Sequence, residues 1–265
     1  MPSRSSIPRV LSIAGSDSGG GAGIQADLKA FAACGAHGMT AITAITAQNT
    51  VGVSAVEAIP GEMIVAQVRA VVQDIGVDAI KIGMLGTVAT IDAVDRALDL
   101  VPDGVPVVID PVMVAESGAE LLEPEARAAL ATRLLPRATV TTPNVPEARA
   151  LTGLAAGAEP EELARGVLAL GPRAVVVTGG HREQATDLFY DGELIVEIPG
   201  PRYADGAAHG SGCTHSSVLA ARLAWGDEPL QAARRAKEMA AAAVRDGLVE
   251  IGAGVGPVSV LGRLA

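Results

Sequence analysis

Short apolar runs rich in β-branched residues alternate with longer alanine-rich segments of helical period along this chain. Such runs, bounded by turn residues, are typical of buried strands, whereas apolar positions three and four apart are typical of helices. The pattern predicts strands at 10–14, 39–46, 53–59, 77–82, 105–110, 139–142, 173–178, 187–190 and 194–198. It predicts helices at 24–34, from after Pro60 to about 75, and at 87–100, 124–135, 161–170, 212–225 and 229–247. The chain is therefore expected to be an α/β protein.

The order of these elements predicts a mainly parallel central sheet with helices on both faces. The exception is the pair of runs around Asp191-Gly192, a dipeptide typical of a two-residue hairpin turn between antiparallel strands. In open parallel sheets, ligands bind beyond the carboxyl ends of the strands. The loops that directly follow the strands are therefore where candidate functional residues are expected.

Length and composition favour one well-packed domain spanning residues 1–265, since the chain is 49% hydrophobic and 19% charged. Aromatic residues make up only 2% of the chain, so Ala, Val, Leu and Ile must build the core. This scarcity also excludes the aromatic stacking platforms that bind single-stranded nucleic acid.

The formal net charge of −10 makes the chain a poor candidate for nucleic-acid binding, which relies on basic surfaces. Cys34 and Cys213 are too few for a disulfide framework or a zinc site, which favours a reduced, cytoplasmic protein. No apolar run approaches the roughly 18 residues of a transmembrane helix, so no membrane partner is expected.

The first strand is followed by a glycine-dense loop, residues 15–23. It contains neither an in-register G-x-G-x-x-G dinucleotide fingerprint nor the lysine of a Walker A loop. The loop is either a flexible turn or a place where a ligand approaches the backbone closely. Asp27, one turn into the next helix, would by itself be interpreted as a surface charge.

A second glycine-rich segment, His209-Gly-Ser-Gly-Cys-Thr214, opens an alanine-rich helix. The free N–H groups and the dipole of a helix N-terminus can bind an anion there. The same position is expected to lower the pKa of Cys213. The alternative is an ordinary glycine-rich helix start with a small buried cysteine.

Asn144 and Glu147 stand three residues apart, a spacing that would place them on one face at a helix start. They could order the waters of a magnesium ion, or they could simply form a capping box. Asp110 ends a buried strand, where it is either a functional carboxylate or a turn residue. His37, His181 and His215 are expected to be structural or exposed, and Trp225 to lie in the core.

Taken together, six motifs resemble the hydroxymethylpyrimidine/phosphomethylpyrimidine kinase family of the ribokinase-like superfamily. They lie in the family's order at 13–29, 46–50, 81–85, 110–114, 142–144 and 209–213. The likeness runs from about residue 10 to 258, nearly the whole chain. It implies a three-layer αβα sandwich, two successive phosphorylations of a hydroxymethyl pyrimidine, ATP and Mg²⁺ as cofactors, and a homodimer.

By motif position, the resemblance implies that Gln48 binds the pyrimidine, that Asp27 meets the polar edge of its ring, and that Gly15, Met84 and Val112 form other walls. It also implies an anion hole for ATP phosphates at Gly210, Ser211 and Gly212. Asn144 and Glu147 match the pair that organises Mg²⁺, and we assign Asp110 to the same metal site. Cys213 is the candidate catalytic base.

The chain departs from the family pattern at Thr178 and Glu116, where relatives commonly carry lysine, and in the segment 205–208. Threonine occurs at the first of these positions in relatives that also phosphorylate pyridoxal. Pyridoxal kinase, or a kinase that accepts both rings, is therefore an alternative. A pyrimidine-binding regulator without turnover is a second alternative, whereas the absent fingerprint excludes a nicotinamide oxidoreductase.

Overall fold

A computed structural model describes residues 7–179, 185–203 and 207–262 of the chain. All of its strands belong to one nine-stranded sheet in the order β3-β2-β1-β4-β5-β6-β7-β8-β9. The strands are β1 (Arg9–Asp17), β2 (His37–Gln48), β3 (Val53–Ala58), β4 (Ala79–Ile82), β5 (Val107–Ile109), β6 (Val140–Thr141), β7 (Val175–Val177), β8 (Asp187–Tyr190) and β9 (Ile195–Ile198). The six central strands, from β2 to β7, pair in parallel, whereas β3, β8 and β9 are antiparallel to their neighbours.

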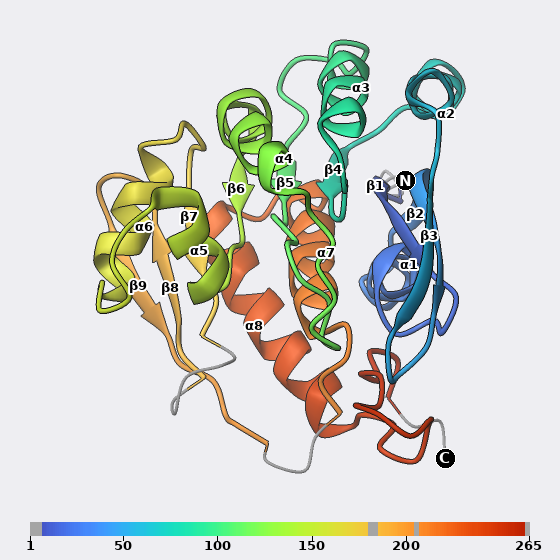
Figure 1. Ribbon diagram of the computed structural model, residues 1–265. Coiled ribbons are helices and arrows are strands. Elements are labelled where there is room, and N and C mark those ends of the chain that lie inside the picture. The colour runs from blue at the N-terminus through green and yellow to red at the C-terminus, as the bar shows by residue number, and fades with distance from the viewer. Residues whose placement is uncertain (1–6, 180–184, 204–206, 263–265) are drawn as a thin grey trace, which may run out of the picture.

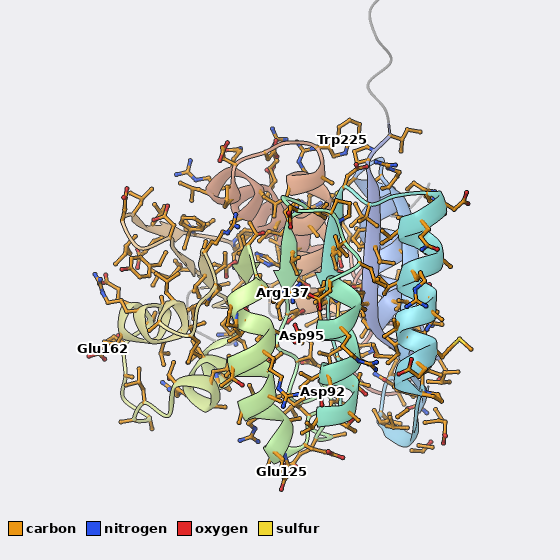
Figure 2. The ribbon with its side chains drawn as sticks, turned by 90° about the horizontal axis from the view of Figure 1, so that it is seen from above. Asp92, Asp95, Glu125, Arg137, Glu162 and Trp225 are labelled. Atoms are coloured by element: carbon orange, nitrogen blue, oxygen red, sulfur yellow. The ribbon has the colours of Figure 1, made fainter. Side chains whose placement is uncertain are left out.

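Helices cover both faces of this sheet, as the alternating pattern predicts (Figures 1 and 2). They are α1 (Gly23–Ala33), α2 (Gly61–Asp74), α3 (Val88–Leu98), α4 (Pro124–Ala129), α5 (Val145–Thr152), α6 (Pro160–Leu168), α7 (Ser211–Ala224) and α8 (Pro229–Arg245). Successive strand residues face opposite layers. On β5, Val107 and Ile109 pack in a core with α2, α3 and α4, whereas Val108 packs in a core with α1, α7 and α8. The three-layer αβα architecture is confirmed.

Several boundaries differ from the predicted ones. β1 continues to Asp17, through residues expected to form a loop, because pairing with β2 resumes after a register shift between Ala14 and Ser16. The helix predicted at 124–135 ends at Ala129 and continues as a π-helical turn, Leu130–Leu134, and a 3-10 turn, Leu135–Arg137. Pro136 has no N–H with which to extend an α-helix.

The expectation that Trp225 lies in the core is wrong. The residue follows the last turn of α7, its side chain is 37% exposed, and it lies at the rim of the molecule (Figure 2). Its indole N–H donates to the Cys34 carbonyl at 2.9 Å, which joins the end of α7 to the end of α1. The described part of the chain holds no helix that is both long and apolar enough to cross a membrane.

A fully buried ion pair joins four elements beneath the carboxyl edge of the sheet. Lys81 Nζ of β4 donates to Asp27 Oδ1 of α1 at 2.8 Å, and neither side chain is exposed. Ser217 of α7 donates to the same carboxylate at 2.7 Å and Ser12 of β1 at 2.6 Å. Burial opposes the ammonium, but the charges of Asp27 and Asp110 and the hydrogen bond to Asp27 outweigh it and raise the pKa of Lys81.

Removing one partner leaves the other charge buried and unpaired, which typically costs about 3–5 kcal/mol. We expect Asp27→Asn to lower the free energy of unfolding by this amount in urea titrations. The double variant Asp27→Asn/Lys81→Met should be destabilised by less than the two single variants together. The control is the exposed pair Glu62–Arg96, where Glu62→Gln should cost less than about 1 kcal/mol. Simple additivity of Asp27→Asn and Lys81→Met would contradict this account.

Candidate active site

A cavity of about 510 Å³ opens where the parallel strands end. Its lining follows the strands in turn: Gly15–Asp17 on β1, Gln48 on β2, Met84 after β4, Asp110 after β5 and Thr142 after β6. The first turn of α7 closes the cavity from the other side. This is the edge at which parallel sheets bind ligands.

The structure brings together all but one of the residues that the sequence singles out for the site. Those that line the cavity are Gly15, Gln48, Met84, Asp110, Val112, Asn144, Glu147, Gly210, Ser211, Gly212 and Cys213. The exception is Asp27, which lies beneath the cavity. Its two oxygens already accept hydrogen bonds from Lys81, Ser217 and Ser12. The expectation that Asp27 meets a bound ring is therefore corrected, because in this structure its carboxylate holds Lys81 and does not reach the cavity.

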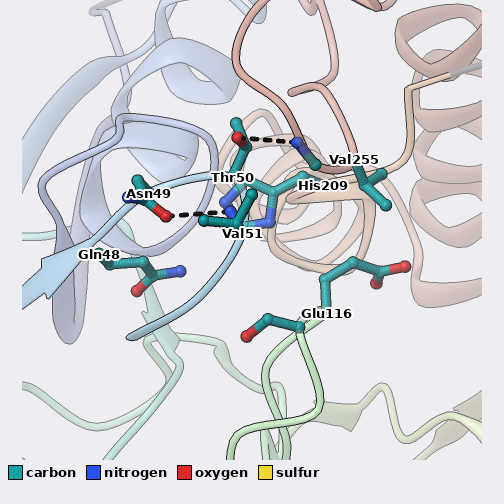
Figure 3. A pocket seen from close by; sticks show the side chains of 9 residues that line it. Gln48, Asn49, Thr50, Val51, Glu116, His209 and Val255 are labelled. Carbon is teal, nitrogen blue, oxygen red and sulfur yellow. Dashed lines mark hydrogen bonds between the residues drawn. The ribbon is translucent and has the colours of Figure 1, made fainter. Parts of the chain in front are cut away.

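Gly15, Gln48 and Met84 shape one end of the cavity. A Cβ on Gly15 would stand 2.9 Å from the Met84 Cε, so the Met84 thioether packs directly against the Gly15 backbone. The half-buried Gln48 side chain lies 3.2 Å from the Thr46 hydroxyl. Gln48 also lines a smaller adjoining cavity of about 250 Å³, together with Asn49, Thr50, Glu116 and Val255 (Figure 3).

The N-terminus of helix α7, which is the segment expected to bind an anion, lines the cavity. Gly210 precedes the helix with φ +84°, and a Cβ there would stand 1.8 Å from the Gly21 carbonyl oxygen, so the position requires glycine. The Ser211 N–H already donates to the Ala208 carbonyl at 3.0 Å. Within the described part of the chain, the N–H groups of Gly212 and Cys213 therefore remain for an anion.

Asp17 and His209 hold this N-terminus against the glycine loop, and neither was singled out from the sequence. The buried Asp17 carboxylate accepts N–H bonds from Gly19, Gly21 and Ala22, and His209 Nε2 lies 2.9 Å from it. Burial opposes its charge, but these bonds outweigh that effect and lower the pKa of Asp17. The loop at 15–23 is thus fixed and is not a flexible turn. Two features of the sequence could have pointed to them. Asp17 is a carboxylate at a strand end before a run of glycines, and His209 directly precedes Gly210.

The expectation that the pKa of Cys213 is lowered is wrong. Burial raises the pKa of this thiol to about 12, and the nearby carboxylates of Asp27 and Asp110 add to the shift. Lys81 and the Gly23 N–H act in the opposite direction but do not compensate. The helix N-terminus favours a thiolate only where desolvation does not outweigh it. The thiol is therefore neutral at pH 7, which speaks against Cys213 as a preformed base.

Asp110, Asn144 and Glu147 form an acidic region beside the anion hole. The capping box is present, because Asn144 Oδ1 accepts from the Glu147 N–H and Glu147 Oε2 accepts from the Asn144 N–H, both at 2.8 Å. Burial, and then the charge of Asp110, raise the pKa of Glu147 to about 8. Burial is also the main reason that the pKa of Asp110 is raised.

This region fits a hydrated divalent cation. Two neighbouring carboxylates with raised pKa values would be relieved by a cation, and the buried Thr142 hydroxyl has no hydrogen-bond partner. The described residues contain no cluster of three or more His, Cys, Asp or Glu able to hold a metal ion. A magnesium ion here would therefore keep waters and take further ligands from phosphates, as is usual for Mg²⁺.

The departures from the family pattern lie around the same cavity. Thr178 lines it at the end of β7, and Glu116 lies at the mouth, where Figure 3 shows it across from Gln48. Of the remaining histidines, His37 is exposed and His215 is buried among the lining residues. His181 and the residues Asp205 and Gly206 lie outside the described part of the chain.

Comparisons with known proteins agree with this geometry. A family model described as phosphomethylpyrimidine kinase matches residues 17–259. The chain is 50% identical to a hydroxymethylpyrimidine/phosphomethylpyrimidine kinase of Rhizobium meliloti over 94% of this chain and 95% of that protein. Its structure is similar to an ADP complex of Bacillus subtilis pyridoxal kinase, with a TM-score of 0.86, 40% identity, and 96% and 97% of the two chains covered. It is also similar to Staphylococcus aureus pyridoxal kinase in complex with pyridoxal, with a TM-score of 0.87, 35% identity, and 96% and 93% covered.

The matched span includes the cavity lining except Ala14, Gly15 and Ser16, and it includes the glycine loop from Asp17 onward and the start of α7. The family model covers most of the chain, and the relative that is 50% identical carries the same activity in its name. The chain belongs to the phosphomethylpyrimidine kinase family.

Proposed function

We propose that this chain, acting as a single kinase domain, phosphorylates 4-amino-5-hydroxymethyl-2-methylpyrimidine with ATP and then phosphorylates the monophosphate to the pyrophosphate. The product would serve the synthesis of thiamine diphosphate. The observation that carries the proposal is that an amide side chain, Gln48, and the N-terminus of α7 face one cavity. An aminopyrimidine and a transferring phosphoryl group need these two features.

The pyrimidine would lie at the Gln48 end, with Gly15, Met84 and Val112 as walls. An amide both donates and accepts, so Gln48 can pair with an amino group and a ring nitrogen together. The hydroxymethyl oxygen would then face the first turn of α7. The N–H groups of Gly212 and Cys213 would stabilise the charge on the phosphoryl oxygens in the transition state.

Phosphoryl transfer passes through a loose transition state in most analyses, so it depends on positioning and charge neutralisation more than on an early base. We therefore assign the catalytic contribution of Cys213 to its backbone N–H and treat its neutral thiol as a wall beside the acceptor. Asp110, Glu147 and Asn144 would hold Mg²⁺ through its waters. Bound there, the ion would neutralise charge on the β- and γ-phosphates of ATP.

Pyridoxal is a second candidate substrate. Two of the similar solved structures are pyridoxal kinases, one of them in complex with pyridoxal. The two free cysteines and the need for ATP fit a cytoplasmic enzyme, which is where we place the reaction.

We also propose a homodimer through the free edge of β3. This strand is the last of the sheet and, among the described strands, pairs only with β2, and Val56 on it is about half exposed. A second copy would pair with this edge and cover Val56. Light scattering should give the mass of two chains, and Val56→Lys should reduce it to one.

The function is tested by incubating the protein with ATP, Mg²⁺ and either hydroxymethylpyrimidine or pyridoxal, and identifying the products by mass spectrometry. We expect the pyrimidine monophosphate first and the pyrophosphate later. Phosphorylation of pyridoxal alone would favour the second candidate. Tight pyrimidine binding without any transfer would instead indicate a regulator.

Gln48→Ala should raise the KM for the pyrimidine by about 10- to 100-fold, as expected for a lost hydrogen-bond pair of roughly 1–3 kcal/mol. The KM for ATP should stay within about twofold, because Gln48 lies at the opposite end from the phosphates. Steady-state kinetics with each substrate varied in turn measure both. An unchanged pyrimidine KM would remove Gln48 from the binding site.

Glu147→Gln should raise the Mg²⁺ concentration needed for half-maximal turnover by about tenfold, since a carboxylate is lost from an Mg²⁺ site. It should leave the stability nearly unchanged, because glutamine can still accept the Asn144 N–H. The matched control is Glu162, which accepts the Glu159 N–H in the equivalent box of α6 and lies at the outer edge of the molecule (Figure 2). Glu162→Ala should cost about 1 kcal/mol and leave the Mg²⁺ requirement unaltered. Normal Mg²⁺ dependence in Glu147→Gln would reduce Glu147 to a helix cap.

A Cys213 pKa of about 12 predicts slow alkylation by iodoacetamide at pH 8, with a rate that still rises between pH 9 and 11. The thiolate is the reactive form, and raising the pKa shifts its appearance to higher pH. Bound pyrimidine should slow the reaction further. Cys213→Ala should keep turnover within about tenfold, whereas loss of a general base costs about 10²-fold or more. A rate plateau below pH 8 combined with a 10²-fold loss in the alanine variant would restore the base role.

A further inference from the structure

A second buried cluster of charged side chains lies at the other end of the cavity, away from Gln48. It consists of Asp187 at the start of β8, His215 on α7 and Lys237 on α8, and all three line the cavity. Their side chains are 2%, 6% and 11% exposed. Thr178, at the end of β7, lines the same end.

The Asp187 carboxylate organises this cluster. Its Oδ1 accepts from Lys237 Nζ at 2.7 Å and from the Gly179 N–H at 2.9 Å. Its Oδ2 faces His215 Nε2 at 3.3 Å. Burial opposes the charged form, but the neighbouring His215 and Lys237 and the Gly179 N–H outweigh it and lower the pKa of Asp187.

Lys237 is held in place along its length. A Cβ on Gly200 would stand 2.4 Å from the Lys237 Cε, so the lysine stem packs directly against the Gly200 backbone. An ammonium has three donors, and Asp187 takes one of them. Because Asp187 Oδ1 binds both Lys237 and Gly179, the ammonium lies beside Gly179, the residue directly after Thr178. It is therefore placed to meet an anion that enters between β7 and α7.

His215 is buried, yet nothing in the proposed reaction uses it. Neither ring nitrogen has a hydrogen-bond partner among the described residues, and neither does Asp187 Oδ2, although Nε2 and Oδ2 stand 3.3 Å apart. Two facing buried polar groups that are both left without a bond need a reason to be there. Their approach offers one, since an imidazole at this place can steady the carboxylate whose other oxygen holds Lys237.

We propose that His215 is a positioning residue for nucleotide binding: it orients Asp187, which in turn presents the Lys237 ammonium to the phosphates of ATP. This inference rests on the proposed function only in taking a nucleoside polyphosphate as the ligand. His215 itself touches no phosphate. Its effect is therefore expected to require both Lys237 and a phosphate chain on the ligand.

The test is calorimetric binding of Mg²⁺ with a non-hydrolysable ATP analogue, and separately of adenosine, without any pyrimidine present. His215→Leu should weaken analogue binding by about tenfold and leave adenosine binding within about twofold, because charge-assisted contacts to phosphate are strong and adenosine has none. His215→Gln, whose amide nitrogen can take the place of Nε2, should bind the analogue within about twofold of the wild type. Thr214→Val, a neighbouring buried change outside the cavity lining, is the control and should alter neither ligand.

The Lys237→Met background separates a positioning role from a general loss of structure. There, adding His215→Leu should weaken analogue binding by less than about twofold, since the group through which it acts is gone. A full tenfold effect in that background, or equal weakening of adenosine, would overturn the proposal. If His215→Leu does not fold, His215→Asn replaces it, because its shorter amide cannot reach Oδ2 and the same losses are expected. If the variants show these differences in binding but the wild-type protein never phosphorylates a pyrimidine, only the proposed substrate is wrong.

Discussion

The geometry of the cavity depends on one buried ion pair, Asp27–Lys81. It ties β1, α1, β4 and α7 together at a point that no water reaches. Ser217 carries this constraint into α7, only a turn and a half from the anion hole at its start. The pair therefore fixes where the helix N-terminus stands relative to the ends of the strands, and Lys81 still lines the cavity floor. Breaking such a pair is costly because each charge depends on the other in a medium of low polarity.

Burial also determines the protonation states of the other acidic groups in the cavity. Glu147 holds its proton up to a pKa of about 8, and Cys213 up to about 12, because desolvation opposes a second and third negative charge beside Asp110. Each lysine of the lining is already balanced by an aspartate. The buried lysines of the site thus leave little unbalanced positive charge, and the site suits a ligand that arrives with its own cation. Magnesium with the polyphosphate of ATP is such a ligand.

The sequence predicted the layers of the fold and most of the cavity, since strand periodicity is local and parallel strands end at a common edge. It failed where the outcome depended on contacts between distant residues. Asp17 and His209 are 192 positions apart, and Asp187 and Lys237 are 50 positions apart, so no local pattern pairs them. The error on Cys213 has the same cause, because a helix start is visible in the sequence but the burial that outweighs its dipole is not. Asp27 lies near the cavity, as expected, but its carboxylate binds Lys81 and does not face the cavity.

The central claim is that a pyrimidine and the γ-phosphoryl group of ATP meet at the N-terminus of α7. A crystal structure with hydroxymethylpyrimidine, Mg²⁺ and a non-hydrolysable ATP analogue tests it most directly. The account predicts the ring against Gln48, and the hydroxymethyl oxygen about 3–3.5 Å from the γ-phosphorus, as reacting atoms require. The γ-phosphoryl oxygens should accept from the Gly212 and Cys213 N–H groups. A pyrimidine bound elsewhere, or phosphates away from the first turn of α7, would contradict it.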